Sequence, residues 1–286
     1  MSSRRLKRIV NEIKELHDSQ KILEQSGIYF NYNEENVNII YALLIGPEKT
    51  PYEKGFYFFK FEYPESYPME PPKTKYCTQG MLKHATANSF VSVRFNPNLY
   101  TCGKVCLSML NTWQGPGWVP TNTLSNVLVA IQALVLNEEP LQNEPGYENA
   151  HKKEYEKYNN VIQYANIKIS VLEMISKIPK DFEFFKTIIE DYFIKNIDYY
   201  RNFVLSKNDL LKDTLKDASK DASKHALLES PAYGMKVIID YEAILYEIEQ
   251  LYENIITQRE INNVAKSLEK ATIDETKNKS ETDSEK

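Results

Sequence analysis

The sequence predicts an α+β protein, with strands and turns in its first half and helices in the rest. Two observations lead to this prediction. Of the 13 prolines, all but Pro179 and Pro231 lie at or before Pro145. Short apolar runs bounded by turn residues precede that point, whereas long stripes with helical spacing follow it. Because proline interrupts helices and central strands, its uneven distribution marks a change in architecture.

The first elements are a helix and a series of strands. Residues 4–18 carry apolar side chains at helical spacing and a basic outer face, formed by Arg4, Arg5, Lys7 and Arg8. Residues 28–32 and 37–45 are predicted strands around a polar turn, and residues 56–61 form a third, aromatic-rich strand. The proline-rich residues 67–72 are predicted to form a rigid, extended connection.

An irregular stretch and a helix follow. Residues 90–120 show no period of 2 or 3.6, and a stretch of that kind in a compact domain is usually functional. Helical spacing resumes from Leu124 to Val135, with Thr121 or Asn122 as the expected N-cap. Pro140 and Pro145 then end the helix.

The remaining chain is predicted to be helical at residues 155–175, 182–203 and 235–256. The last segment has an apolar stripe close to heptad spacing, which fits either a partner-binding coiled coil or packing on its own domain. The short length of the run favours the second. The charged repeat at residues 216–224 predicts a solvated loop or frayed helix end, and the polar residues from 266 onwards predict disorder.

The composition excludes several classes of protein. A hydrophobic share of 42%, with 20 Tyr and 12 Phe among 286 residues, is enough for a large core. A net charge of −5 argues against a general nucleic-acid binder, whose affinity depends on phosphate neutralisation. Three cysteines are too few for a disulfide scaffold and indicate a reducing compartment.

No segment predicts secretion or membrane insertion. The longest apolar run, at residues 39–45, is far shorter than the ~20 residues of a membrane span. The start of the sequence lacks the apolar region of a secretory signal, and Glu12 and Glu15 argue against a transit peptide. We therefore expect an intracellular protein without membrane contact, located in the cytoplasm and, as a second compartment, in the nucleus.

Cys106 lies inside the irregular stretch. A free cysteine is most often a small buried apolar residue. A metal site is not indicated, because no histidine or further cysteine completes a ligand set beside Cys102 and Cys106. A papain-like site needs a positioned histidine, and none of the four histidines lies in a recognisable motif. The remaining interpretation is a nucleophilic or acceptor thiol without a dedicated base.

An ordered set of motifs resembles the ubiquitin-conjugating enzymes, which carry ubiquitin as a thioester on one cysteine. The motifs are RLKRIVNEIKEL at 5–16, GPEKTPYEKGFY at 46–57, YPMEPPK at 67–73, NPN at 96–98, GKVCLSML at 103–110 and WVP at 118–120. The family usually has His-Pro-Asn where this chain has NPN. That change, the run at 96–118 and NEPGYE at 143–148 look most like the Z-type conjugating enzymes, which carry a long helical C-terminal extension.

The resemblance implies an α+β fold with an N-terminal helix, a four-stranded antiparallel meander and C-terminal helices, followed by an all-helical extension. We expect the conjugating core in residues 1–150 and the extension, packed on the core, in residues 151–265. A disordered polar tail is expected in residues 266–286.

The resemblance also implies roles for residues near the cysteine. Cys106 matches the thioester-forming cysteine. Asn98 matches the motif asparagine, whose amide is proposed to stabilise the oxyanion or to brace the active-site loop. Asn96 replaces a histidine that is generally regarded as structural, so the change concerns loop geometry more than chemistry. Asn143 or Glu144 lies near the position of the family's acidic gate residue.

Further positions match the family's partner-binding surfaces. Lys7 and Arg8 match the basic pair that meets the activating enzyme. Tyr76 and Pro120 fall where the two ligase-facing loops lie. Cys102 stands where the family often has asparagine and is interpreted as incidental.

The expected chemistry needs neither a metal nor a bound cofactor. Thiolates are strong nucleophiles, although a thiol near pKa ~8.5 is only partly ionised at neutral pH. A lysine amine near pKa ~10.4 must lose a proton before it attacks, and a carboxylate such as Glu144 can accept that proton. ATP is used by the activating enzyme, and this chain has no P-loop motif for binding it.

Two functions remain open at this stage. In the first, Cys106 takes ubiquitin or a ubiquitin-like protein from an activating enzyme and passes it to a substrate lysine, usually with a ligase. In the second, the chain is a catalytically silent scaffold that binds proteins of the same pathway. Silent relatives lack the active cysteine, so the presence of Cys106 favours the enzyme. We expect a monomer whose partners are these proteins and not nucleic acid.

Overall fold

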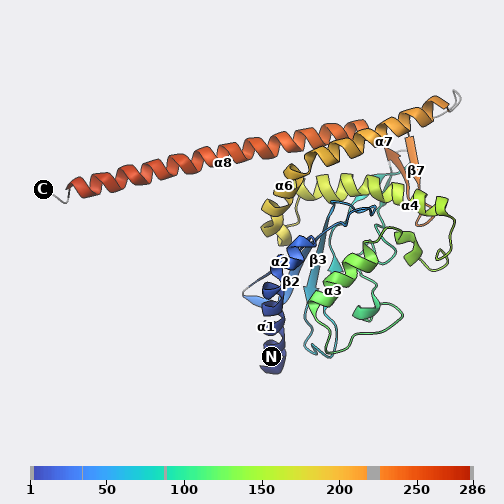
Figure 1. The fold of residues 1–286 in the computed structure, drawn as a ribbon, viewed down its shortest axis with the longest axis horizontal. Helices are drawn as coiled ribbons and strands as arrows, with labels where there is room; N and C mark the ends of the chain where they lie inside the picture. The colour runs from blue at the N-terminus through green and yellow to red at the C-terminus, as the bar shows by residue number, and fades with distance from the viewer. Residues whose placement is uncertain (1–2, 34, 87–88, 218–225, 284–286) are drawn as a thin grey trace.

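The computed structural model describes the backbone of residues 3–33, 35–86, 89–217 and 226–283 (Figure 1). The first elements are α1 (Ser3–Asp18), α2 (Gln20–Gln25), β1 (Ile28–Asn33), β2 (Asn36–Ile45), β3 (Phe56–Glu62), β4 (Lys73–Tyr76), β5 (Met81–Lys83) and β6 (Phe90–Ser92). They are followed by η1 (Ser108–Leu110), α3 (Leu124–Ala130), η2 (Ile131–Val135), η3 (Pro140–Asn143), α4 (Lys152–Ala165), η4 (Asn166–Glu173) and α5 (Met174–Ser176). The last elements are η5 (Lys180–Phe185), α6 (Lys186–Lys195), α7 (Ile197–Asp217), β7 (Ala226–Glu229), β8 (Lys236–Ile239) and α8 (Tyr241–Asp283). The predicted α+β class is confirmed.

The four-stranded sheet has the predicted meander order β1-β2-β3-β4, and every neighbouring pair is antiparallel. Leu43 of β2, for example, pairs with Phe58 of β3. Side chains alternate between the two faces of a strand, yet β3 is buried on both faces because helices cover each side. Phe58 packs on Phe182 of η5, with ring centroids 4.8 Å apart, whereas Phe59 packs on Tyr76, 5.4 Å away.

Helix α1 is amphipathic as predicted, and Ile9 and Ile13 on its inner face are buried. The prediction that Arg5 belongs to the outer basic face is wrong, because this residue is only 3% exposed. Its guanidinium donates hydrogen bonds to the backbone oxygens of Tyr63 and Pro64, each at 2.7 Å. Arg5 therefore fixes α1 to the segment that follows β3.

A buried carboxylate holds α1 against two other segments. Glu12 is 2% exposed and accepts hydrogen bonds from Arg8 Nε at 2.6 Å and from the Tyr67 hydroxyl. It also accepts from the Tyr63 hydroxyl at 3.3 Å and from the backbone N–H of Leu124 at 3.1 Å. A buried charge is tolerated only when it is well paired. These four donors therefore bind α1, the proline-rich connection and the start of α3 together.

The helix that follows the irregular stretch has the predicted extent, as α3 and η2, but a different N-cap. Thr123 is the N-cap, and neither Thr121 nor Asn122 has that role. Its backbone N–H donates to Asn126 Oδ1 at 2.9 Å, and its side chain accepts from Asn126 N at 3.4 Å. This reciprocal pair is a capping box, and only Thr123 has the required spacing to Asn126.

The extension packs along one face of the sheet and not as a separate body. The two long helices predicted at 155–175 and 182–203 are observed as α4-η4-α5 and η5-α6-α7. Tyr41 contacts Phe182 with ring centroids 5.4 Å apart, and Phe56 contacts Tyr192 at 6.0 Å. One hydrophobic core includes residues of the sheet, of α3 and of the extension helices. The domain boundary at residue 150 stays a prediction.

The prediction that the extension is all helical is wrong in one place. Strands β7 and β8 form an antiparallel hairpin, and α8 begins at Tyr241 rather than at Met235. Gly234 has a φ of +61°, a conformation that glycine adopts without strain, and β-branched residues after it favour a strand. The hairpin lies beside β5, because His84 forms a β-bridge with Val237.

The apolar stripe of α8 packs on the chain's own helices. Ile244, Ile248 and Ile255 are buried, and Glu249 accepts two hydrogen bonds from Arg201 of α7, at 2.5 and 2.7 Å. Of the two interpretations of this stripe, packing on its own domain is therefore the one observed. A role for the same face as a partner-binding coiled coil would require these residues to be exposed.

Helix α8 runs on to Asp283 and projects away from the rest of the fold (Figure 1). The backbone up to Asp283 thus contradicts the predicted disorder from residue 266. The physical reason is that no glycine or proline occurs between residues 241 and 283, so nothing interrupts the helix once it has begun. Helix α7 covers the start of the charged repeat, and the rest of it lies outside the described residues.

Candidate functional site

The backbone of Cys106 is held on both sides by one residue of the NPN motif. The N–H of Cys106 donates to the backbone oxygen of Asn98 at 2.8 Å. The side-chain Nδ2 of Asn98 in turn donates to the backbone oxygen of Cys106 at 2.6 Å. The contact is of the kind that the bracing role of Asn98 requires, and the catalytic roles of Cys106 and Asn98 stay predictions.

Thr112 holds the residues on either side of the cysteine. Its hydroxyl donates to the backbone oxygen of Val105 at 2.8 Å and accepts from the N–H of Leu107 at 2.9 Å. Because the residues before and after Cys106 are bound to one side chain, the cysteine segment cannot shift without breaking several hydrogen bonds. Sequence reasoning missed Thr112, since a lone threonine in an irregular stretch carries no signal.

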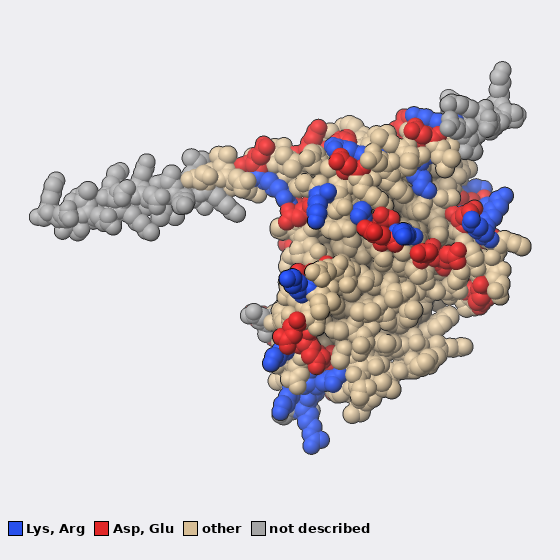
Figure 2. Space-filling view, in the orientation of Figure 1, with Lys and Arg blue, Asp and Glu red and all other residues tan. Residues whose placement is uncertain are grey.

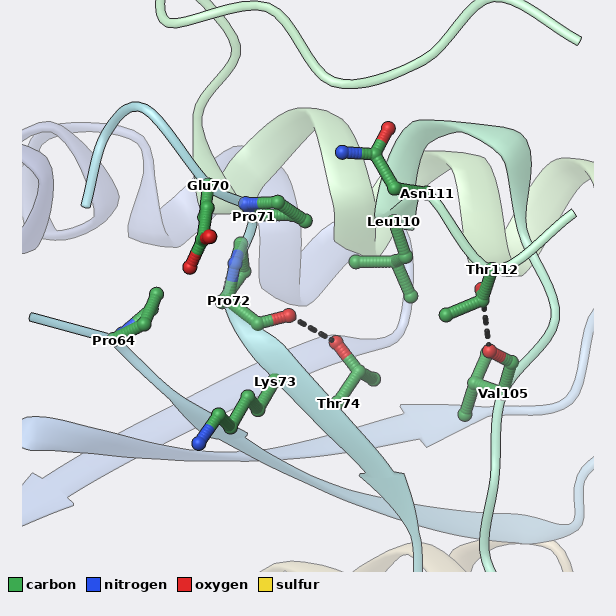
Figure 3. Close-up of a pocket in the computed structure, with 10 residues that line it drawn as sticks. All are labelled: Pro64, Glu70, Pro71, Pro72, Lys73, Thr74, Val105, Leu110, Asn111 and Thr112. Atoms are coloured by element: carbon green, nitrogen blue, oxygen red, sulfur yellow. Dashed lines mark hydrogen bonds between the residues drawn. The ribbon is translucent and has the colours of Figure 1, made fainter. Parts of the chain in front are cut away.

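A groove of about 310 Å³ borders this segment. Figure 3 shows that the side chain of Leu110 points toward Pro71 and Pro72, while Glu70 and Lys73 add charges to the lining. The Thr112–Val105 hydrogen bond lies at one end of the view (Figure 3). The cysteine segment therefore forms part of a largely apolar surface.

Asn96, which replaces the usual histidine, is fully buried and satisfied by hydrogen bonds. Its Nδ2 donates to Val135 O at 2.6 Å and to the Tyr52 hydroxyl at 3.1 Å. Its Oδ1 accepts from Asn98 N at 2.8 Å and lies 3.4 Å from Asn143 Nδ2. Asn96 thus fixes the turn that carries Asn98. The asparagine therefore performs a structural task in this loop.

The three cysteines differ in their surroundings. Cys106 is only 2% exposed, whereas Cys102 is exposed and Cys77 is partly buried. Burial raises the pKa of the Cys77 thiol to about 11, so this group is almost entirely protonated at neutral pH. Cys102 takes part in none of the contacts that hold Asn98 and Cys106. The bracing contacts therefore distinguish Cys106 from the other two.

The two candidates for the acidic gate position, Asn143 and Glu144, contact different parts of the protein. Asn143 donates to Leu134 O at 3.0 Å and faces Asn96, so it belongs to the structural support of the loop. Glu144 is partly exposed and accepts a hydrogen bond from the hydroxyl of Tyr233, in the turn of the β7–β8 hairpin. Of the two, Glu144 carries the carboxylate that a proton transfer needs.

Comparison with known families decides the classification. A family model described as ubiquitin-conjugating enzyme matches residues 8–168, which is more than half of the chain. The chain belongs to the ubiquitin-conjugating enzyme family. The matched residues include the sheet, the NPN motif, Cys106 and α3, so the site described above lies inside the family's own region.

Individual members of the family give the same result. The chain is 39% identical over 175 residues to the ubiquitin-conjugating enzyme E2 Z of Xenopus tropicalis, covering 61% of this chain and 53% of the relative. It is 42% identical over 163 residues to the E2 Z of Homo sapiens, covering 56% and 43%. A putative ubiquitin-conjugating enzyme E2 38 of Arabidopsis thaliana is 37% identical over 200 residues, covering 66% and 57%. The chain thus spans about half the length of these relatives.

For this member of the ubiquitin-conjugating family, the predicted activating-enzyme contacts differ in exposure. Lys7 is exposed on α1, and basic side chains gather where α1 begins (Figure 2). Arg8 is partly buried, pairs with Glu12 and donates to the backbone oxygen of Asn122 at 2.9 Å. Lys7 is therefore free to meet a partner, whereas Arg8 first serves to join α1 to the segment before α3.

The predicted ligase contacts also differ. Pro120 is exposed, in the segment between Trp118 and α3. Tyr76 is 2% exposed, and its ring packs on Phe59 and Phe95. Its side chain is therefore part of the core and does not offer a surface to a ligase, which the sequence pattern alone could not reveal.

Two kinds of feature are absent from the described residues of this family member, a metal-binding cluster and a membrane-spanning helix. Among them, no group of three or more His, Cys, Asp or Glu side chains could hold a metal ion. Within the same part of the chain, no helix is both long and apolar enough to cross a membrane.

Proposed function

We propose that this chain is an active conjugating enzyme that carries ubiquitin, or a ubiquitin-like protein, as a thioester on Cys106 and transfers it to a lysine of a substrate protein. The observation that supports this most directly is the double bracing of Cys106 by Asn98 in a chain of this family. It fixes the backbone of Cys106 within a loop that several side chains keep rigid. The partners in this proposal are an activating enzyme, ligases and the substrate protein.

In the first step, the Cys106 thiolate attacks the carbonyl carbon of the thioester on the activating enzyme. The new carbon–sulfur bond forms through a tetrahedral oxyanion, and the activating enzyme's thiolate leaves. Reactant and product are both thioesters, so the exchange is nearly balanced in free energy and needs no strong base. Because Cys106 is only 2% exposed, its thiol must become accessible to the incoming carbonyl before this step.

In the second step, the neutral amine of a lysine attacks the Cys106 thioester. An amide bond forms, the Cys106 thiolate leaves, and the amine gives up a proton. At neutral pH most lysine side chains are protonated, so a nearby acceptor increases the reactive fraction. We assign this acceptor to Glu144, whose carboxylate is partly exposed.

Replacing Asn98 by alanine is expected to slow lysine transfer by about 100-fold, the size of effect seen when one oxyanion donor is removed. The amide nitrogen has two N–H groups, so one can hold Cys106 O while the other donates to the oxyanion. Loading and single-turnover discharge to free lysine are measured separately. A loss of transfer with near-normal loading supports the oxyanion role, an equal loss of both supports bracing alone, and unimpaired transfer contradicts any role of Asn98.

The proposed function is tested by incubating the chain with activating enzyme, ATP and ubiquitin, followed by a non-reducing gel. A shifted band that disappears with thiol reductant is the expected result. A panel of ubiquitin-like proteins with their activating enzymes extends the test. If no modifier loads, the silent scaffold, which binds pathway proteins without accepting a thioester, becomes the better explanation.

A further inference from the structure

The β7–β8 hairpin is docked on two loops of the core. The backbone N–H of Ala85 donates to Lys236 O at 2.9 Å, and the Tyr147 hydroxyl donates to Pro231 O at 2.9 Å. Met235, at the end of the turn, is fully buried. The turn of the hairpin, residues 230–235, is therefore held in place by contacts with the core and not only by its own strands.

Tyr233, in this turn, contacts two charged groups at once. Its hydroxyl donates to Glu144 Oε2, and its ring lies 4.8 Å from the guanidinium carbon of Arg94. Burial, followed by the hydrogen bond to Glu144, raises the pKa of Tyr233, so its hydroxyl stays protonated and remains a donor. The side chain thus connects the extension to the acidic residue and to a cation of the core.

Arg94 carries this connection to the motif that holds the cysteine. Its Nη2 donates to Pro97 O at 2.6 Å and its Nε donates to Asn96 O at 3.2 Å. Arg94 also lies over the ring of Tyr100, 3.5 Å from the ring centroid. The NPN carbonyls are therefore held by a guanidinium that two tyrosine rings contact, one of them from the extension.

The hydrogen bond from Tyr233 leaves part of the carboxylate available. It uses Oε2 of Glu144, and no other side chain or backbone group of the described residues hydrogen-bonds Oε1. A carboxylate held at one oxygen keeps a fixed orientation while its second oxygen can accept a proton. This arrangement fits an acceptor for an attacking amine better than a freely rotating side chain does.

We propose that Tyr233 is a positioning residue for lysine transfer, which it supports by orienting the Glu144 carboxylate. This inference rests on the proposed function and adds to it a role for the extension in the chemistry of the core. The contact joins residues 89 positions apart in the chain. The extension then acts on the second step, from thioester to lysine, and not on loading.

The full chain and its Tyr233→Phe variant are charged by activating enzyme and ATP with ubiquitin, or with the modifier of the panel that Cys106 accepts. Discharge to free lysine is then followed without a ligase. Phenylalanine retains the ring over Arg94 and removes only the hydroxyl. We expect normal loading and discharge slowed about tenfold, the effect of losing a hydrogen bond to a charged group.

Two further variants separate positioning from a structural effect. Tyr147→Phe removes the hydrogen bond from the Tyr147 hydroxyl to Pro231 O in the same hairpin. It leaves the hydrogen bond between Tyr233 and Glu144 in place, so discharge should match the wild type. In a Glu144→Gln background, Tyr233→Phe should cause no further slowing, because its effect passes through the carboxylate.

The outcomes distinguish this inference from the proposed function. Discharge of the Tyr233→Phe variant at the wild-type rate overturns the inference while normal loading leaves the proposed function intact. The inference is also overturned, and the proposed function left intact, if Tyr233→Phe slows discharge by the same factor in the wild-type and the Glu144→Gln backgrounds. A wild-type chain that accepts no modifier refutes both.

Discussion

Replacing Cys106 by serine is expected to remove the reductant-sensitive adduct and to leave an ester that survives thiol reductant. The serine oxygen can form an ester with the modifier, but thiols do not exchange with an oxygen ester as they do with a thioester. Transfer to lysine should fall on the order of 10³-fold or more, as when other enzymes lose their nucleophile. The backbone bonds between Cys106 and Asn98 do not involve the sulfur, so the loop should keep its structure.

Cys102→Ser and Cys77→Ser are the matched controls, and both should load normally. Cys102 is exposed but takes no part in the bracing contacts, and Cys77 has a pKa raised to about 11 by burial. Loading is read from non-reducing gels with and without reductant. If a reductant-sensitive band persists in Cys106→Ser and vanishes in Cys102→Ser, the thioester forms on Cys102 and our assignment to Cys106 is wrong.

The second large effect concerns stability. Glu12→Gln is expected to lower the free energy of unfolding by about 3 kcal/mol, the lower end of the range for breaking a buried ion pair. The amide that replaces the carboxylate cannot accept from all four donors that surround Glu12, and Arg8 loses its counter-charge. Because Arg8 is partly exposed, water can solvate its guanidinium, which keeps the effect near that lower end.

Urea denaturation measures this loss. The ring centroids of Trp118 and Tyr67 lie 5.9 Å apart, and Tyr67 is one of the Glu12 donors. The fluorescence of Trp118 therefore reports on the surroundings of Glu12. Glu15→Gln is the matched control, because Glu15 lies on the same helix and is exposed, and its effect should stay within about 0.5 kcal/mol. Equal stability of the Glu12→Gln and Glu15→Gln variants would show that the buried network contributes nothing.

Much of the fold could be predicted because its signals are local. The spacing of Ile9, Ile13 and Leu16 is enough to predict α1, since helix periodicity repeats every few residues. The turn and strands around residues 28–45 follow from the same kind of short-range pattern. The hairpin was missed because β7 and β8 have only four residues each, too few to show a period of two.

The candidate site divides in the same way. NPN and Cys106 could be singled out from the sequence because their two motifs follow each other closely, and the structure adds the hydrogen bond that joins Asn98 to Cys106. The burial of Tyr76 could not be predicted, because it depends on which side chains the sheet and the NPN segment bring against it. The same holds for Arg5, whose basic character suggested the surface but whose partners are carbonyls after β3.

The sequence by itself therefore determined the family, the α+β class and the cysteine on which the proposed chemistry depends. Only the tertiary structure decided that Glu12 joins three segments and that Tyr233 of the extension reaches Glu144. The physical reason is distance along the chain. These hydrogen bonds span 112 and 89 residues, and their geometry depends on how whole elements pack against one another, which no local pattern of residues records.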